Sequence, residues 1–288
     1  MGTWLGHAAP GTFFICFSLW WLITSLRSYY HSLSKAEPYT NSLVRQCCWK
    51  KGCHSRFSLD SWFLILVVTI GAVMEIVTSI LATHTLIMGN LQHFTMYISF
   101  GLFAVTSILV HHKVKFVPKG TEYMALMMAL GVELVLFRFH LHGRHEVDTH
   151  LHMLLVYTIA ASIVVVGIEM LYPHSITVLL ARSYGALLQG TWFHQIGVSL
   201  YTPYALTEEQ LKNPESIMLV TLIFAWHMIG CLMAMILVSG LVYCCSPSTH
   251  QTDYYNDNAT PVAYSHCVSD DEDDHHKLLP PSSHNSLS

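Results

Sequence analysis

The stretch HLHGRHEVDTHLHMLL, residues 140–155, is a polar segment between two long apolar runs. Its five histidines, together with Arg144 and Asp148, cannot continue either run through a hydrocarbon layer. The runs on its two sides, 121–139 and 151–172, are close to the length of about 20 residues that crosses a bilayer. Residues 140–150 are therefore predicted to be a short connection between two membrane-spanning helices.

The same pattern continues along the whole chain. Of its 288 residues 52% are hydrophobic and only 11% are charged, against about 25% charged residues in a soluble domain. Residues 1–245 contain seven apolar runs, at about 11–30, 61–83, 92–112, 121–139, 151–172, 176–200 and 217–243. We therefore predict an all-α, polytopic integral membrane protein with a seven-helix transmembrane bundle, in which the first run is a retained helix.

The basic residues predict the orientation of these helices. Eleven of the 14 Lys and Arg side chains fall on one side of the seven-span topology, and that side is expected to face the cytosol. The N-terminus is then luminal or extracellular and the C-terminus is cytosolic. No basic surface of the kind that binds nucleic acid is present, so the expected partner of this region is the lipid bilayer.

Residues 246–288 have a different composition. They are polar and acidic, with few large apolar residues, so we expect a disordered cytosolic tail. Asp274 followed by Leu278 and Leu279 fits an acidic dileucine sorting signal, which predicts binding to clathrin adaptors. Cys244 and Cys245, at the end of the last span, are candidate palmitoylation sites.

Several histidines fall in one leaflet of the predicted bundle. In the predicted topology His93 opens the third span, His140 closes the fourth and His152 opens the fifth. His227 lies about ten residues into the seventh span. Glu75 and Glu133 fall in the same layer. Asp148 lies one helical turn before His152, where a carboxylate can orient the imidazole through its second N–H group. The sequence thus gathers a luminal His/Glu cluster.

Ionisable residues inside spans are costly and often functional. Mixed His and carboxylate ligands suit zinc or iron, so the four histidines are candidate ligands of a metal or haem. Glu75 or Glu133 is then a candidate catalytic proton carrier in hydrolytic or redox chemistry. Two alternatives stay open. In the first, the His/Glu layer is a structural hydrogen-bonded network in a non-enzymatic protein that acts in trafficking or assembly. In the second, the layer is a path for protons or ions.

Short motifs give the chain a family resemblance. They are GHAAPGTFF (6–14), HFTMYISFG (93–101), HLHGR (140–144), LLQGTWFHQIG (187–197) and WH (226–227). Together they resemble the transmembrane protein 45 family, a multi-pass group built on a domain of unknown function. The resemblance implies seven helices in secretory or endolysosomal membranes or the plasma membrane, without an assigned reaction. The motif histidines it implies are His7, His93, His140, His142, His152 and His227.

Two glycines make a separate prediction about packing. Gly190 and Gly197 are seven residues apart and lie on one face of the sixth predicted helix. A second helix can approach closely where side chains are missing. We therefore expect another helix to pack on this face.

Overall fold

A computed structural model describes residues 3–35, 38–41, 43, 58–139, 141 and 143–246. Within this part of the chain all regular structure is helical, which confirms the predicted fold class. The α-helices are α1 (Trp4–Ser34), α2 (Leu59–Thr83), α3 (Met88–His111), α4 (Thr121–Phe139), α5 (Glu146–Leu171), α6 (Ile176–Tyr201) and α7 (Pro214–Cys244). A short 3-10 helix, η1 (Gln210–Lys212), precedes α7.

Five of the described helices are long and apolar enough to cross a membrane, namely α1, α2, α3, α5 and α7. The other two, α4 and α6, carry more polar side chains. Those side chains face other helices, because Glu133 of α4 and Arg182 and Gln189 of α6 are all at least 97% buried. Burial inside the bundle thus explains why these two helices are less apolar than their neighbours.

The helix ends follow local chemistry. Thr3 caps α1 by accepting a hydrogen bond from the Gly6 N–H, and Asn213 caps α7 by accepting one from Glu215, with Pro214 at the first helical position. In the α4–α5 turn, Gly143 has a φ of 78°, which a residue without Cβ adopts without strain. The caps therefore mark the starts of α1 and α7, and Gly143 marks the turn between α4 and α5.

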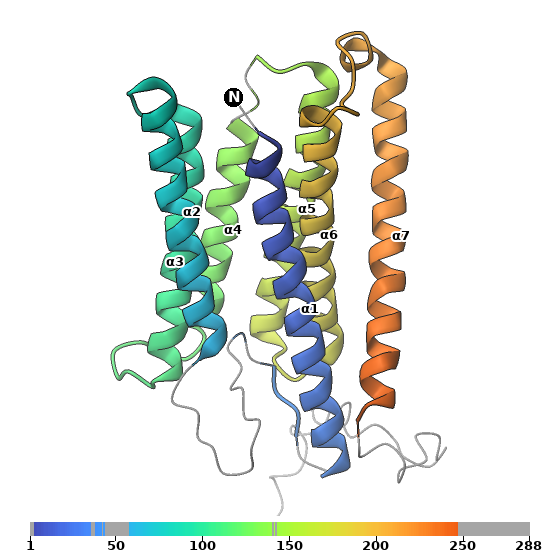
Figure 1. Ribbon diagram of the computed structural model, residues 1–288. Coiled ribbons are helices and arrows are strands. Elements are labelled where there is room, and N and C mark those ends of the chain that lie inside the picture. Colours follow the sequence, from blue (N-terminus) through green and yellow to red (C-terminus); the bar gives the residue numbers. More distant parts are fainter. Residues whose placement is uncertain are drawn as a thin grey trace, which may run out of the picture. The chain divides into compact units, whose positions relative to one another are not determined.

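The helices pack in a definite order. The α2–α3 hairpin contacts α4 through α3, α4 contacts α5, and α5 contacts α6. Helix α1 packs mainly on α6, while α7 packs on α1, α5 and α6 (Figure 1). The α2–α3 hairpin and α7 therefore lie at opposite flanks of the helical unit, with α1, α4, α5 and α6 between them.

The predicted approach at the glycines of α6 is confirmed. A Cβ atom added to Gly190 would lie 2.8 Å from the carbonyl oxygen of Gly11 on α1. One added to Gly197 would lie 3.2 Å from the Cβ of His7, also on α1. The missing side chains therefore bring α1 against α6, and this contact positions His7.

Candidate functional site

The first component of the site is a histidine held by a carboxylate. His152, on the second turn of α5, is 1% exposed. Its Nδ1 lies 2.9 Å from both the Oδ1 and the backbone oxygen of Asp148. Both neighbours are acceptors, so Nδ1 carries a proton, and in the neutral form of the ring the lone pair lies on Nε2. The contact expected between Asp148 and His152 is present.

Asp148 is fixed from its other side by Arg144. The Nη1 of Arg144 lies 3.0 Å from each oxygen of the Asp148 carboxylate, and the guanidinium also bonds to Tyr201 at the end of α6. Burial of the guanidinium acts to lower the pKa of Arg144. The Asp148 carboxylate and Tyr201 outweigh it, so the pKa is raised above its usual value. Arg144 therefore stays charged and holds Asp148 in place.

The second histidine of the site comes from α1. His7 is 7% exposed, and its Nδ1 donates to the backbone oxygen of Thr3 over 3.0 Å. The centre of its ring lies 5.8 Å from that of His152 and 5.0 Å from that of Tyr201. His7 thus also keeps its lone pair on Nε2, and two buried imidazoles with the same tautomer lie side by side.

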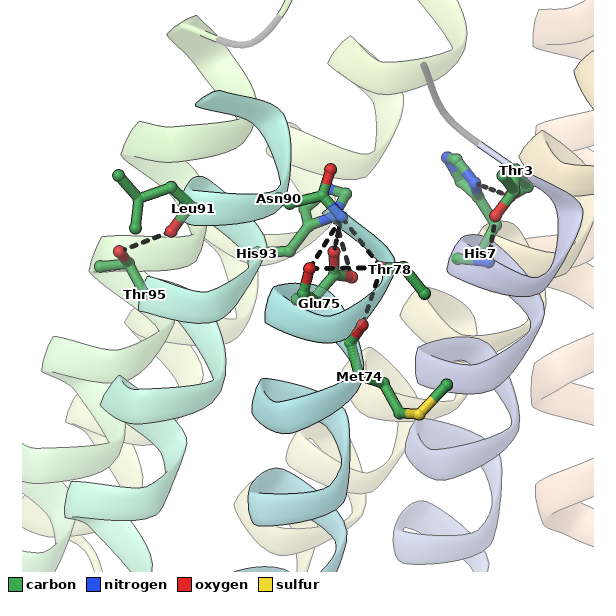
Figure 2. A network of polar contacts seen from close by, with 10 residues as sticks. Thr3, His7, Met74, Glu75, Thr78, Asn90, Leu91, His93 and Thr95 are labelled. Atoms are coloured by element: carbon green, nitrogen blue, oxygen red, sulfur yellow. Dashed lines mark hydrogen bonds and ion pairs between the residues drawn. The ribbon is translucent and has the colours of Figure 1, made fainter. Parts of the chain in front are cut away.

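A third polar group lies on the α2–α3 hairpin. The Oε1 of Glu75 is 3.2 Å from the Nδ1 of His93, and its Oε2 accepts a hydrogen bond of 2.8 Å from Asn90. Figure 2 shows these contacts on the two helices of the hairpin, and the Thr3–His7 contact on the neighbouring α1. Glu75 and His93, which the sequence places in one layer, are therefore in contact.

The remaining predicted residues have other partners. The Nε2 of His227 on α7 lies 3.4 Å from Gln195 on α6. Glu133 on α4 accepts a hydrogen bond of 2.9 Å from Gln189. His140 lies outside the described residues, as do His142 and the sorting residues Asp274, Leu278 and Leu279. Cys244 and Cys245 are described, and both are exposed at the end of α7; their palmitoylation stays a prediction.

The predicted histidines therefore form separate contacts. Within the described part of the chain, no group of three His, Cys, Asp or Glu side chains is close enough to hold a metal ion. Of the predicted metal ligands, His152 has a second histidine, His7, beside it. His7 was not one of the predicted ligands. One signal pointed to His7, namely its place among the motif histidines. The glycine face of α6 predicted the close approach of a helix but did not identify that helix as α1. His150, expected beside the turn, lies within α5 and contacts Thr221 of α7 over 2.8 Å.

Comparison with known proteins finds a family of unknown function and two relatives that are named as transmembrane proteins. Residues 119–240 match the model of a family described as "Family of unknown function (DUF716)". The chain is 23% identical over 249 residues to transmembrane epididymal protein 1 of Rattus norvegicus, covering 84% of this chain and 81% of the relative. It is 23% identical over 258 residues to transmembrane epididymal protein 1A of Mus musculus, covering 86% of this chain and 85% of that relative.

These relatives are named as transmembrane proteins, in agreement with the five apolar helices. The chain is an integral membrane protein similar to a family without an assigned activity. The narrower resemblance to the transmembrane protein 45 family stays a prediction.

Proposed function

We propose that the protein binds a metal ion inside the membrane bundle, with His7 and His152 as ligands and zinc or iron as the metal. One observation carries the proposal. Two buried imidazoles from different helices each donate through Nδ1 to a fixed oxygen, which leaves both Nε2 lone pairs available. Metal-binding histidines almost always show this arrangement, because the second hydrogen bond fixes the tautomer and the direction of the ring.

The spacing of the two rings supports a single ion between them. At metal–nitrogen distances of about 2.1 Å, the ring centres of two histidines on one tetrahedral zinc lie about 5 to 6 Å apart. The centres of His7 and His152 are 5.8 Å apart. The distance between the ring centres therefore fits one shared ion, with the two ring planes at 76° to each other.

Two protein nitrogens leave further coordination positions for water or a substrate. A zinc ion held by His7 and His152 would lower the pKa of a bound water to about 7 and would so supply the nucleophile for hydrolysis of a lipid ester or amide. The Glu75–His93 pair, on the α2–α3 hairpin beside α1, is the proposed proton acceptor. Glu133 is assigned no part in this centre.

We also propose the orientation inferred from the basic residues, with this end of the bundle toward the lumen or the cell exterior. The acidic dileucine in the tail then faces the cytosol and directs the protein among secretory, endolysosomal and plasma membranes by binding clathrin adaptors. The excess of Lys and Arg on one side supports this assignment.

The metal content of the purified full-length protein tests the proposal. Elemental analysis of a detergent preparation should give about one equivalent of zinc or iron. His7→Ala and His152→Ala should each lose most of it. His31→Ala is the matched control, because His31 is an exposed histidine near the other end of the same helix as His7.

Two further variants separate this site from the four-histidine arrangement. His93→Ala and His227→Ala should retain most of the metal if His7 and His152 are the ligands, and should lose it if all the predicted histidines meet at one ion. A folded, metal-free preparation of the parent protein would refute the proposal and leave the histidines as a hydrogen-bonded layer.

A further inference from the structure

The α6–α7 groove, between these two helices, is a second candidate site, and the paired histidines do not line it. Its volume is about 440 Å³, within the range of about 300 to 1,000 Å³ that is typical of sites for small molecules. Its walls are mostly apolar, and its polar side chains are Thr191, His227 and Cys231. Helix α7 lies at a flank of the helical unit, and Trp226 in the groove wall is 64% exposed, so the groove is open to lipid (Figure 1).

His227 brings a hydrogen-bond acceptor to this groove. Its Nε2 lies 3.4 Å from the Oε1 of Gln195, whose amide nitrogen donates to Ser199 over 3.0 Å. Because the Gln195 oxygen can only accept, the Nε2 of His227 carries a proton, and in the neutral form of the ring the lone pair lies on Nδ1. Within the described part of the chain, this Nδ1 has no hydrogen-bond partner. A donor for Nδ1 is therefore missing from the described residues.

His227 lies within the hydrocarbon layer, close to its edge. Its partner Gln195 is six residues before Tyr201, the last residue of α6, which is about 9 Å along the axis. Helix α6 has 26 residues and is about 39 Å long, so each end extends about 4 to 5 Å beyond a hydrocarbon layer of about 30 Å. Water is scarce at this level, and an unsatisfied acceptor is costly there. The missing donor is therefore expected to be the hydroxyl group of an apolar molecule.

The groove continues from His227 toward the middle of the membrane along a smooth surface. Gly230 and Ala234 follow on the same face of α7, about one and two turns farther along the helix. A Cβ atom added to Gly230 would meet no atom within 4 Å, so the space beside it is open. From His227 to Ala234 the groove extends over about 10 Å of the helix axis. A rigid, flat ring system can lie against these two small residues.

We propose that the α6–α7 groove binds a membrane sterol, whose hydroxyl group donates to the Nδ1 of His227 and whose fused rings lie along Gly230 and Ala234. A sterol has one hydroxyl donor at one end of a rigid apolar body, which matches one acceptor at one end of an apolar groove. The direction also agrees, because a sterol places its hydroxyl group toward the edge of a leaflet and its hydrocarbon tail toward the membrane centre. This inference does not depend on metal binding.

A phospholipid acyl chain satisfies the groove less well than a sterol. The chain would fill the apolar space, but it has no donor and would leave the Nδ1 of His227 unsatisfied. A flexible chain also loses more conformational freedom than a fused ring system when it is held in place. The sterol therefore fits both the polar end and the smooth wall of the groove.

Photolabelling of the full-length protein in lipid nanodiscs tests the proposal. The probe is a cholesterol analogue that keeps its hydroxyl group and carries a diazirine on the rings, and mass spectrometry locates the labelled residues. Label should appear on the α6 and α7 residues that line the groove, and excess cholesterol should remove it. Gly230→Leu fills the groove and should lower the labelling about tenfold or more. Gly240→Leu is the matched control, because Gly240 is an exposed glycine of α7 whose added Cβ would also meet no atom within 4 Å, but it does not line the groove.

The role of the hydroxyl group has a separate test. Cholesteryl methyl ether has the same rings but cannot donate, so it should compete about fivefold less well than cholesterol, which is the effect of one hydrogen bond. His227→Phe keeps an aromatic ring without an acceptor, and in this variant the two competitors should be equal. A variant that only disturbed packing would still distinguish them.

Label spread over all lipid-facing helices, or label that excess cholesterol does not remove, would overturn the proposal. Equal competition by the methyl ether in the parent protein would overturn it as well. If the parent protein forms a dimer that Gly230→Leu dissociates, and the groove stays unlabelled, a second copy of the chain fills the groove and the sterol is excluded.

Discussion

The close crossing of α1 and α6 gives a quantitative prediction for Gly190→Ala. A Cβ atom at this position would lie 2.8 Å from the Gly11 carbonyl oxygen, 2.8 Å from the backbone nitrogen of Ile15 and 2.9 Å from its Cγ1. Two of these three atoms belong to the backbone of α1 and cannot rotate away. The methyl group therefore has to push the two helices apart.

The magnitude follows from two opposing effects. Overpacking of a tight contact costs about 1 to 3 kcal/mol, and backbone contacts on α1 put Gly190→Ala at the upper end of that range. Replacing glycine by alanine within a helix contributes about 1 kcal/mol in the other direction. We therefore expect Gly190→Ala to lower the free energy of unfolding by about 2 kcal/mol. A Cβ at Gly230 of α7 would meet no atom within 4 Å, so Gly230→Ala should raise it by about 1 kcal/mol.

Reversible unfolding in mixed micelles of a mild and a denaturing detergent, followed by far-UV circular dichroism, measures both variants. The effects of Gly190→Ala and Gly230→Ala on the free energy of unfolding should differ by about 3 kcal/mol. Equal effects would mean that α1 does not approach α6 as closely as the structure places it, and the position of His7 would then be wrong as well.

Four further predictions address orientation, trafficking, the buried ion pair and the metal. An antibody tag at the N-terminus should be accessible only from the lumen or the exterior, and one at the C-terminus only from the cytosol; both ends on one side would refute the orientation. Replacing Leu278 and Leu279 by alanine should raise the fraction of protein at the cell surface, measured by surface biotinylation. Arg182→Met should destabilise by about 3 to 5 kcal/mol, because Glu169 is left buried without its partner; replacing both residues by apolar ones should cost less, as measured by detergent unfolding. Asp148→Asn should weaken metal binding about 10- to 100-fold in a chelator competition.

The apolar runs predict the helices well because about 20 consecutive apolar residues have few other solutions in a bilayer. The starts of two helices are less accurate. Helix α1 begins at Trp4, before the predicted 11–30 run. Thr3 caps this start, and the helix includes Gly6 and Pro10 although both residue types disfavour helix. Helix α5 begins at Glu146, where acidic residues are stabilised by the helix N-terminus although they are too polar for a span.

Contacts between neighbours in sequence could be predicted, and those between distant helices could not. Asp148 and His152 share one helix face, and Glu75 and His93 face each other across one hairpin, so spacing alone brings each pair together. The meeting of α1 with α5 and α6 depends on the order of the helices around the bundle. Hydrophobic periodicity does not encode that order, because most faces of these helices are apolar.

The glycines of α6 nevertheless contain part of the missing information. Gly197 has His7 against it on α1, and Tyr201, one turn farther along α6, has its ring 5.0 Å from the ring of the same histidine. Tyr201 in turn bonds to Arg144, which holds Asp148 and through it His152. A Cβ atom at Gly197 would lie 3.2 Å from the Cβ of His7, so His7 would have to shift, while the Arg144–Asp148–His152 contacts would remain. The close packing at Gly197 therefore helps to place His7 beside His152, and the proposed metal site depends on that placement.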